Sequence, residues 1–309
     1  MDELVKTLIT ATDFLKNATD EPSKEIGEQL ANMINLIFTP LQIARIYKDI
    51  KLQAFLEKVK NKYLNIPVEE LTSPPLNILG PALEASKYYY DQDELRDMFA
   101  NLVASLCDKR ISGIIHPAYV EVLKQITPLE AQLLSAFRPK SGFSIHFSVG
   151  MYPNNELMKQ VNSLDEPESS YYTFPETIMP VVNYWFANET TRILIQNHVL
   201  INEICDDFTL ISASVVNLQR LGLLEISYTN KLNDTEYNTF LTNQKYLDWH
   251  DNLILNKDKK VTLQFIRGHM VIPGQYNRID IEKGTARLTQ FGFNFIDTCV
   301  IKSRIIPNL

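Results

Sequence analysis

The sequence predicts a mainly α-helical protein with a smaller α+β part, and three observations lead to this fold class. Only 10 of the 309 residues are glycine, so long stretches can be helical without interruption. Apolar residues make up 45% and charged residues 22%, which is the composition of a folded globular chain. Apolar residues recur at helical spacing through most of the first 140 positions, whereas the C-terminal third mixes helices with short strands.

Net charge, cysteine usage and hydropathy narrow the class of protein. A net charge of -7 and a pI near 5.4 oppose a general nucleic-acid-binding surface, because phosphate repels such a field. Cys107, Cys205 and Cys299 stand far apart among apolar neighbours, which predicts buried thiols in a reducing compartment rather than disulfides or a zinc site. We expect no secretory signal and no membrane span, because the most apolar run, 33–46, is short and contains Pro40.

The N-terminal part is predicted to be helical. Residues 1–65 contain helical patterns, with 17–23 as a polar connector. The clearest pattern is an amphipathic helix over 48–64. Its apolar face consists of Leu52, Phe55, Leu56, Val59 and Tyr63. Residues 65–81 contain four prolines and predict an ordered linker or a pair of sharp turns.

Residues 81–137 predict consecutive helices with short joints. Pro81 is expected to begin a helix, and Asp91 and Glu94 have the spacing of a capping box for the next one. Pro117 begins another helix, and Thr127-Pro128 with Glu130 forms a second capping box. The inward-facing residues are predicted to be Leu95, Phe99, Leu102, Leu106, Tyr119, Val122, Leu123, Ile126, Leu133, Leu134 and Phe137. This pattern is typical of an antiparallel helical array.

The remainder of the chain predicts a mixture of helices and strands. Alternation over 143–149 indicates a short strand, and apolar spacing over 193–204 indicates a helix. A helix over about 210–221 stops at Gly222 and leads into a strand. Further expected elements are strands at 261–272 and 284–289, a turn at Pro273-Gly274, and a helix over 291–300.

The C-terminal helix–glycine–strand order resembles a winged-helix module. The resemblance lies in VVNLQRLGLLEIS, which begins at Val215, and in GTARLTQFGFNFIDTC, which begins at Gly284. The first helix of this module would be about 128–138. We therefore expect two domains: a helical domain over 1–127 and a winged-helix-like α+β domain over 128–309. Insertions are expected at about 145–190 and about 230–256.

The residues show no known catalytic or metal-binding pattern. There is no glycine-rich phosphate loop, no G-x-S-x-G, no H-E-x-x-H and no C-x-x-C. The acidic side chains of residues 81–137, and His116, do not have the sequence spacing of a metal-binding site. Helix capping or exposure on a solvated face explains them more simply. The stretch Tyr88 to Glu94 has two readings, a ligand-binding aromatic cluster or a helix end that packs one tyrosine inward, and the second is favoured. We expect no catalytic residue, no metal and no cofactor, and the sequence leaves open whether the protein is an enzyme.

Nucleic-acid contacts, if the winged module made them, would come from the helix over 212–221. Its candidate groups are Asn217, Gln219 and Arg220, with one positive charge among them. One cation makes too few phosphate contacts for tight binding. A protein contact or a structural role is therefore favoured for this helix.

The run Pro74 to Ala131 resembles the core segment of the abortive-infection alpha family of bacterial phage-resistance proteins. The matching pieces are Gly80-Pro81-Ala82-Leu83-Glu84, Tyr88 to Asp91, Glu94-Leu95-Arg96, Phe99-Ala100-Asn101-Leu102, Asp108-Lys109 and His116-Pro117. Beyond about residue 140 no piece resembles the family. The resemblance implies a bacterial cytoplasmic protein that limits phage growth, and it supplies no reaction and no catalytic residue.

Two hypotheses follow from the sequence. The first is an interaction protein that recognises a phage or host protein through the family-like segment, and a homo-oligomer is compatible with it. The candidate interaction surface is Tyr88, Tyr90, Asp91, Arg96, Asn101, Asp108, Lys109 and His116. The second hypothesis is a nucleic-acid-binding regulator or concealed nuclease that uses the winged-helix module.

Overall fold

The computed structural model describes residues 21–43, 49–137, 178–200, 205–255, 264–266 and 269–300. Its α-helices are α2 (Glu21–Ile43), α3 (Asp49–Tyr63), α4 (Leu76–Ser86), α5 (Asp93–Ser105), α6 (Lys109–Ser112), α7 (Ala118–Leu123), α8 (Pro128–Ala136), α10 (Phe208–Arg220), α11 (Asn238–Thr242), α12 (Gln244–Trp249) and α13 (Gln290–Phe295). Other helical turns are η1 (Val68–Glu70), η2 (Asp234–Tyr237), η3 (His250–Ile254) and η4 (Ile296–Val300). The strands are β1 (Met179–Ala187), β2 (Arg192–His198), β3 (Leu224–Ser227), β4 (Gln264–Ile266), β5 (His269–Val271) and β6 (Arg278–Leu288).

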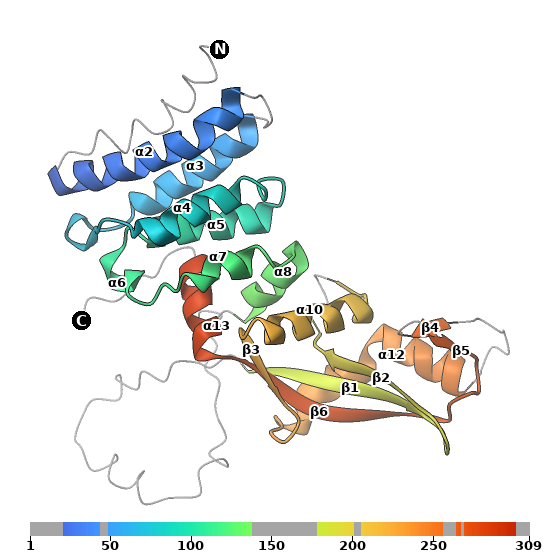
Figure 1. Ribbon diagram of the computed structural model, residues 1–309. Coiled ribbons are helices and arrows are strands. Elements are labelled where there is room, and N and C mark those ends of the chain that lie inside the picture. The colour runs from blue at the N-terminus through green and yellow to red at the C-terminus, as the bar shows by residue number, and fades with distance from the viewer. Residues whose placement is uncertain are drawn as a thin grey trace, which may run out of the picture.

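The described chain is mostly helical with small antiparallel sheets, so the predicted mainly-α class with an α+β part is confirmed. Helices α2 to α8 stack on one another, and the sheet projects from the end of that stack (Figure 1). The larger sheet has the strand order β2-β1-β6-β3, and β4 and β5 form a separate pair. An all-α fold is excluded by these strands.

The predicted amphipathic helix is α3, and its apolar stripe faces the core as expected. Leu52, Phe55, Leu56, Val59 and Tyr63 are all buried. They pack with the apolar face of α5, whose predicted inward residues are also buried. The pattern therefore identified both partners of a central helix pair, since each amphipathic face needs another on which to pack. The predictions for 1–16 and 143–149 lie outside the described residues.

The predicted helix start at Pro81 is wrong. Helix α4 begins at Leu76, directly after Pro74-Pro75, so Pro81 lies inside it. Pro81 is the sixth residue of this helix, so its missing N–H removes one internal hydrogen bond, the one that the Asn77 carbonyl would otherwise accept. Pro74-Pro75 is the better signal for where this helix begins, because a residue that precedes a proline is disfavoured in the helical conformation.

The predicted capping box of Asp91 and Glu94 is also wrong. Helix α5 begins at Asp93 with Gln92 as its N-cap residue, and within the described chain no side chain caps it. The Asp91 carboxylate instead lies 2.7 Å from the ammonium group of Lys51 on α3. The spacing rule failed here because a charge partner on another helix was available.

The second predicted capping box is confirmed. The backbone N–H of Glu130 donates to the Thr127 hydroxyl at 3.3 Å, and the Thr127 N–H donates to the Glu130 carboxylate at 2.6 Å. Pro128 occupies the first turn, where its missing N–H costs nothing. His116 also acts at a helix start, since its Nδ1 accepts from the N–H of Ala118 at 3.1 Å. Both local predictions hold because every partner lies within three residues.

The helix predicted over 193–204 is wrong, because residues 192–198 form strand β2. This strand pairs with β1 through a tight connection in which the Asn188 side chain accepts from the N–H groups of Thr190 and Thr191. Ile193 and Ile195 contribute to the apolar core on one face of the sheet. The three consecutive apolar residues at 193–195 are compatible with a helix or with a strand. The turn that precedes them, between β1 and β2, favours the strand.

Strand β1, which falls within the region expected to be an insertion (about 145–190), lies at the centre of the larger sheet. It pairs with β6 along its whole length, from Met179 opposite Ala286 to Ala187 opposite Arg278. The expected order of helix 210–221, Gly222 and strand is present as α10 and β3, with Gly222 at a φ of 74°. Strands β1 and β2 are additional to a helix–strand–wing arrangement, so this topology does not by itself make the unit a winged helix.

The buried apolar residues of the described chain form two clusters. The first runs through α2 to α5, α7 and α8 and continues into α10, β3 and η4, so it joins regions on both sides of residue 128. The second is rich in aromatic rings and lies between one face of the larger sheet and the helices α11, α12 and η3. Helix α10 contributes to both, since Phe208 belongs to the second cluster and Ile211, Val215 and Leu218 to the first.

His198 is buried beside the second cluster, against its aromatic rings. Its side chain is fully buried, and neither ring nitrogen makes a hydrogen bond within the described part of the chain. The imidazole stacks on Phe208 with ring centroids 3.7 Å apart. Burial lowers the pKa of His198 to about 3, because an imidazolium would lose its hydration there.

The backbone of α13 approaches the backbone just before β3 closely at Gly292. A Cβ added at this position would lie 2.0 Å from the carbonyl oxygen of Leu223, just before β3. The same turn is held by Thr289, whose N–H donates to the Leu223 carbonyl at 3.0 Å and whose hydroxyl accepts from the Gly292 N–H at 2.9 Å. Only glycine allows α13 to pack against β3 in this way.

We expect Gly292→Ala to lower the free energy of unfolding by about 2–3 kcal/mol or more, because the added methyl group overlaps backbone that cannot move aside. Gly113→Ala is the matched control. A Cβ at Gly113 meets no atom within 4 Å, and the residue has a φ of −68°, so this change should be neutral or stabilise by up to about 1 kcal/mol. Urea unfolding of the two variants measures the difference, and equal effects would contradict the packing described.

The burial of His198 predicts a pH-dependent stability. In the unfolded chain its pKa is about 6.5, so below that pH the unfolded state binds a proton that the folded state excludes until about pH 3. This contribution to stability is therefore complete above pH 6.5 and decreases as the pH falls. Between pH 7 and pH 5 the wild type should lose about 2 kcal/mol more than His198→Phe in urea unfolding. Identical pH profiles for the two proteins would show that His198 does not titrate in this way.

Candidate functional site

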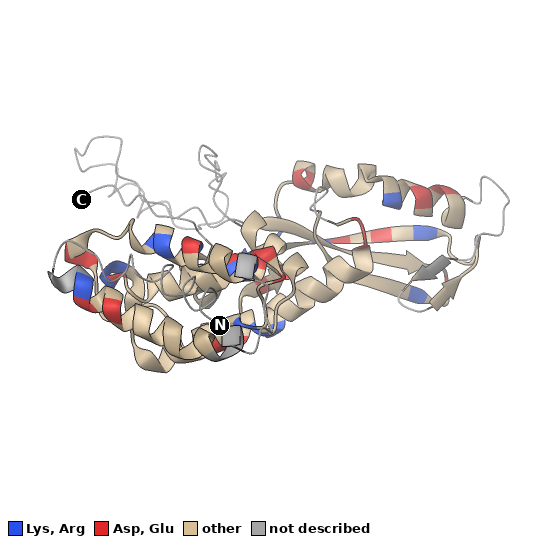
Figure 2. Ribbon diagram, turned by 90° about the horizontal axis from the view of Figure 1, so that it is seen from above, with Lys and Arg blue, Asp and Glu red and all other residues tan. Residues whose placement is uncertain are grey.

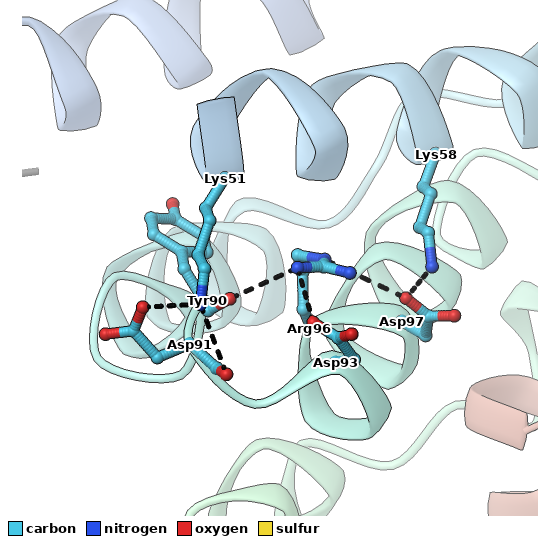
Figure 3. A network of polar contacts seen from close by, with 7 residues as sticks. All are labelled: Lys51, Lys58, Tyr90, Asp91, Asp93, Arg96 and Asp97. Atoms are coloured by element: carbon cyan, nitrogen blue, oxygen red, sulfur yellow. Dashed lines mark hydrogen bonds and ion pairs between the residues drawn. The ribbon is translucent and has the colours of Figure 1, made fainter. Parts of the chain in front are cut away.

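A network of ionic side chains joins α3 to α5 and to the turn that precedes it (Figure 3). The Lys51 ammonium group pairs with Asp91 at 2.7 Å, and Lys58 pairs with Asp97. Arg96 lies between these pairs and contacts Asp93 through Nη1 at 2.8 Å. The network contains three basic and three acidic groups, so its charges balance and it offers no net charge for an ionic ligand.

Burial shows what Arg96 and Tyr90 do in this network. The Arg96 side chain is only 10% exposed, and its Nη1 donates to the Tyr90 carbonyl at 3.3 Å. The ring of Tyr90 is buried between Phe38 and Phe55, with centroid distances of 5.8 and 5.5 Å. Both residues therefore hold the α4–α5 turn against α2 and α3, and they are structural parts of the family-like segment.

Asn101 and Asp108 are also buried and make internal contacts. The Asn101 side-chain amide donates to the carbonyl of Cys299 at 2.5 Å, which connects α5 to the C-terminal η4. Asp108 caps α6 through the N–H of Arg110 at 3.0 Å and also accepts from its guanidinium group. Neither side chain is accessible to a partner.

The remaining members of the predicted surface are exposed. Tyr88 is 72% exposed, and the neighbouring Asp91 side chain is 87% exposed, in the α4–α5 turn. Lys109, the first residue of α6, and His116, which lies just before α7, are also exposed. The imidazole of His116 lies edge-on to Phe291 of α13, with centroids 5.9 Å apart. The structure thus divides the predicted surface into four buried residues and four exposed ones.

The candidate nucleic-acid contacts on α10 are mostly engaged with the helical stack. The Asn217 amide donates to the Glu130 carboxylate at 2.8 Å and to the Gln125 carbonyl at 3.1 Å. Arg220 donates to the Gln125 side chain at 3.1 Å and to Asn217 at 2.7 Å. Gln219 is exposed. In the view of Figure 2 basic and acidic residues are interspersed rather than gathered into a basic face.

The cysteines and acidic groups provide no reactive centre among the described residues. Cys107 and Cys299 are free and buried, as predicted, and burial raises the pKa of Cys107 to about 12 with a smaller effect from Asp108. Such a thiol remains protonated and unreactive. Cys205 is half-buried. The described ranges contain no group of three or more potential metal ligands and no helix long and apolar enough to cross a membrane.

Sequence reasoning missed a polar cluster on the larger sheet, around Asn183. Asn183, at an irregularity in β1, accepts from the Asn197 N–H at 2.9 Å and from the Tyr228 hydroxyl at 2.7 Å. Its amide donates to Glu282 at 2.8 Å. Asn197 has a φ of 53°, a conformation that asparagine tolerates better than most residues. The cluster satisfies the backbone where the strand pairing is interrupted, and nothing in the local sequence pattern indicates it.

The division between buried and exposed residues predicts two different outcomes of substitution. Asn101→Ala should lower the free energy of unfolding by about 1–3 kcal/mol, because the buried Cys299 carbonyl loses its donor. Asp91→Ala should cost less than about 1 kcal/mol, since an exposed ion pair contributes little. Thermal unfolding of both variants provides the comparison. A larger loss for Asp91→Ala than for Asn101→Ala would contradict these roles.

Comparison with known proteins extends the resemblance beyond the segment 74–131. The family model described as abortive infection alpha matches residues 47–299, so the match continues through the sheet and into η4, where no family-like piece was expected. No curated protein and no solved structure matches the chain. Because the family match covers most of its length, this chain belongs to the abortive infection alpha family.

Proposed function

We propose that this protein acts in the bacterial cytoplasm as an abortive-infection factor, and that it limits phage growth by binding a phage or host protein. The family match over residues 47–299 carries the first part of this proposal. The second part is supported by the polar residues of the family-like segment. Some of them are buried and hold the backbone in place, and the others remain exposed. No reaction is assigned, because neither the motifs nor the described side chains form a catalytic arrangement.

The exposed α4–α5 turn is the part of the segment best suited to recognise a protein. Tyr88 projects from it with 72% of its surface exposed, whereas Tyr90, two residues later, is anchored in the core. A rigid backbone that presents an exposed tyrosine has little entropy to lose on binding. Asp91 and Asp93, which lie beside it, are paired with Lys51 and Arg96, so the surroundings of the ring carry no net charge. The partner should therefore offer an apolar pocket for the Tyr88 ring.

The nucleic-acid alternative has less support. Asn217 and Arg220 are hydrogen-bonded to Gln125, and Asn217 also to Glu130, so reading DNA would require them to leave these partners. Helix α10, β3 and β6 remain our proposal for a winged-helix-like unit, with a role in protein contact and in anchoring the sheet. The pairing of β3 with β6, from Leu224 opposite Leu288 to Ser227 opposite Thr285, is compatible with that arrangement.

The plating efficiency of a broad phage panel on a susceptible host tests this proposal. Expression of the wild type should lower plating for at least some phages, and Tyr88→Ala should abolish that protection while leaving the melting temperature unchanged. Leu247→Ala, at an apolar residue of α12 that is 41% exposed, is the matched control and should protect normally.

Unchanged plating across the whole panel would contradict the defence function. Protection by Tyr88→Ala equal to that of the wild type would contradict the proposed surface alone. A purified protein that carries nucleic acid, seen as a raised ratio of absorbance at 260 to 280 nm, would favour the alternative.

A further inference from the structure

Strand β6 is longer than the strand that pairs with one of its two sides. On one side it pairs with β1 from Arg278 to Ala286, whereas on the other side β3 covers only Thr285 to Leu288. In Figure 1, β6 continues past the end of β3 toward the end of the sheet that lies farthest from the helical stack. No described strand pairs with this part of β6, so the sheet has a free edge there.

The pairing of β3 shows which backbone groups of β6 point to the free edge. The Thr289 N–H donates to the Leu223 carbonyl at 3.0 Å in the register of β3 with β6, so the odd-numbered residues direct their N–H and C=O groups toward β3. The pairing of β6 with β1 continues without a register shift, so this alternation extends to Ile279 and Ile281. Neither residue has a hydrogen-bond partner on that side within the described chain.

The η2 turn closes one end of the free edge. The Lys283 ammonium group pairs with Asp234 at 2.6 Å, and the Tyr237 hydroxyl donates to the Gly284 carbonyl at 2.8 Å. The free edge therefore consists of residues 278–282.

The side chains on the two faces of the free edge differ in character. Arg278, Asp280 and Glu282 lie on one face and reach solvent. Ile279 and Ile281 lie on the other face, half-buried against the second hydrophobic cluster. Charged side chains at a strand edge disfavour pairing with an arbitrary strand. The strand that fits this edge must place opposite charges and apolar groups in the matching order.

We propose that the free edge of β6 pairs with the free edge of β6 in a second copy of the chain, antiparallel about a two-fold axis at Asp280. Unpaired N–H and C=O groups along a strand edge are matched by another extended backbone, and in a symmetric pair each edge is the partner of the other. In this register Ile279 of each copy exchanges both backbone hydrogen bonds with Ile281 of the other. The sheets of the two copies thereby join into one.

The order of side chains along the free edge complements itself in this register. Arg278 of each copy lies opposite Glu282 of the other, and Ile279 lies opposite Ile281. Opposite charges, and apolar side chains, that face each other across two strands stabilise the pairing. An axis at Ile281 would instead place Asp280 opposite Glu282, and these two carboxylates would repel each other.

The groups that would meet across the two copies are available for this contact. The Glu282 carboxylate accepts from the Asn183 amide at 2.8 Å and from the Trp185 indole N–H at 3.2 Å, and no Lys or Arg of the described chain pairs with it. Arg278 contacts Asp280 through Nε at 3.1 Å, and its Nη atoms make no hydrogen bond within the described ranges. An ion pair between Arg278 and Glu282 of the other copy therefore breaks no existing contact.

The Asp280 carboxylates, which face each other at the axis, are neutralised within each copy. Each one is paired with Arg278 at 3.1 Å and with Arg192 at 3.6 Å. A pairing this short buries less surface than the roughly 1,000 Å² of a stable interface. The dimer should therefore be reversible, with a dissociation constant in the range of about 1–100 µM.

Analytical ultracentrifugation of the full chain over about 1–200 µM tests whether the dimer forms. The weight-average mass should rise with concentration from the 35.5 kDa monomer toward the dimer. A monomeric mass at all concentrations would overturn the proposal, whether or not another protein binds this edge.

Charge reversal tests the register. Arg278→Glu and Glu282→Arg should each weaken dimerisation about tenfold, because each variant places like charges opposite each other at two symmetric positions. The double variant restores opposite charges and should regain most of the affinity. Lys245→Glu, the same change of charge at an exposed residue of α12, is the matched control and should dimerise normally. Additive weakening in a double variant that melts at the wild-type temperature would contradict the pairing of these two residues.

Crosslinking tests the position of the axis. Residues that face each other in a non-hydrogen-bonded antiparallel pair have Cα atoms about 4.5 Å apart, within reach of a disulfide. In a Cys205→Ser background, which removes the half-buried thiol, Asp280→Cys should therefore form an intermolecular disulfide under mild oxidation. Lys245→Cys in the same background should not, and the two native thiols that remain are buried.

Dimerisation of the chain without the Asp280→Cys crosslink would place the interface elsewhere and overturn this arrangement. Phage protection is a separate measurement, so the dimer can fail these tests while the proposed function holds.

Discussion

The hydrogen bond from the Asn101 side chain to the Cys299 carbonyl joins residues 198 positions apart, and the placement of the C-terminal half depends on the contact that it completes. Next to it, the Ser105 hydroxyl donates to the Thr298 carbonyl at 3.1 Å. Phe295 of α13 packs against Tyr119 of α7 with nearly perpendicular rings 5.3 Å apart. The chain thus leaves the helical stack after α8, forms the sheet and returns to the stack through α13 and η4 (Figure 1). Because β6 leads directly into α13, the central strands are anchored at that end by the family-like segment.

This contact explains why the family-like pieces are spread over so many short stretches. Asn101 and His116 come from separate pieces, yet both contact the C-terminal helices, one through Cys299 and the other through Phe291. Arg96 serves the opposite side of the same segment, where it holds the Tyr90 turn. The segment is therefore a hub that is constrained on several faces by packing. A family match that continues to residue 299 is the expected consequence, since the C-terminal partners of the hub belong to the same structural unit.

Sequence reasoning located the features whose partners are near in the chain. The Thr127–Glu130 capping box and the buried stripe of α3 were both predicted, because a cap or an amphipathic face is complete within a few turns. It failed where a distant partner decided the outcome. Asp91 is paired with Lys51, 40 residues away, instead of capping α5. Residues 192–198 form a strand because β1 lies beside them, although their apolar spacing also fits a helix.

The exposure of the candidate surface residues also depends on partners that are distant in the sequence. Tyr88 and Tyr90 are two residues apart and chemically identical, yet one is 72% exposed and the other 3%. No composition or spacing rule separates them, since the difference arises from Phe38 and Phe55, which reach Tyr90 from two other helices.

The side chains of helix α10 likewise depend on distant partners. The sequence predicted this helix and favoured a protein contact or a structural role for it, and two of its three candidate nucleic-acid groups, Asn217 and Arg220, are hydrogen-bonded to Gln125 of the helical stack. Leu210 and Val216 remain exposed on the outer side of this helix. Because the same helix contributes Phe208 to one hydrophobic cluster and Leu218 to the other, it connects the helical stack to the core beneath the sheet.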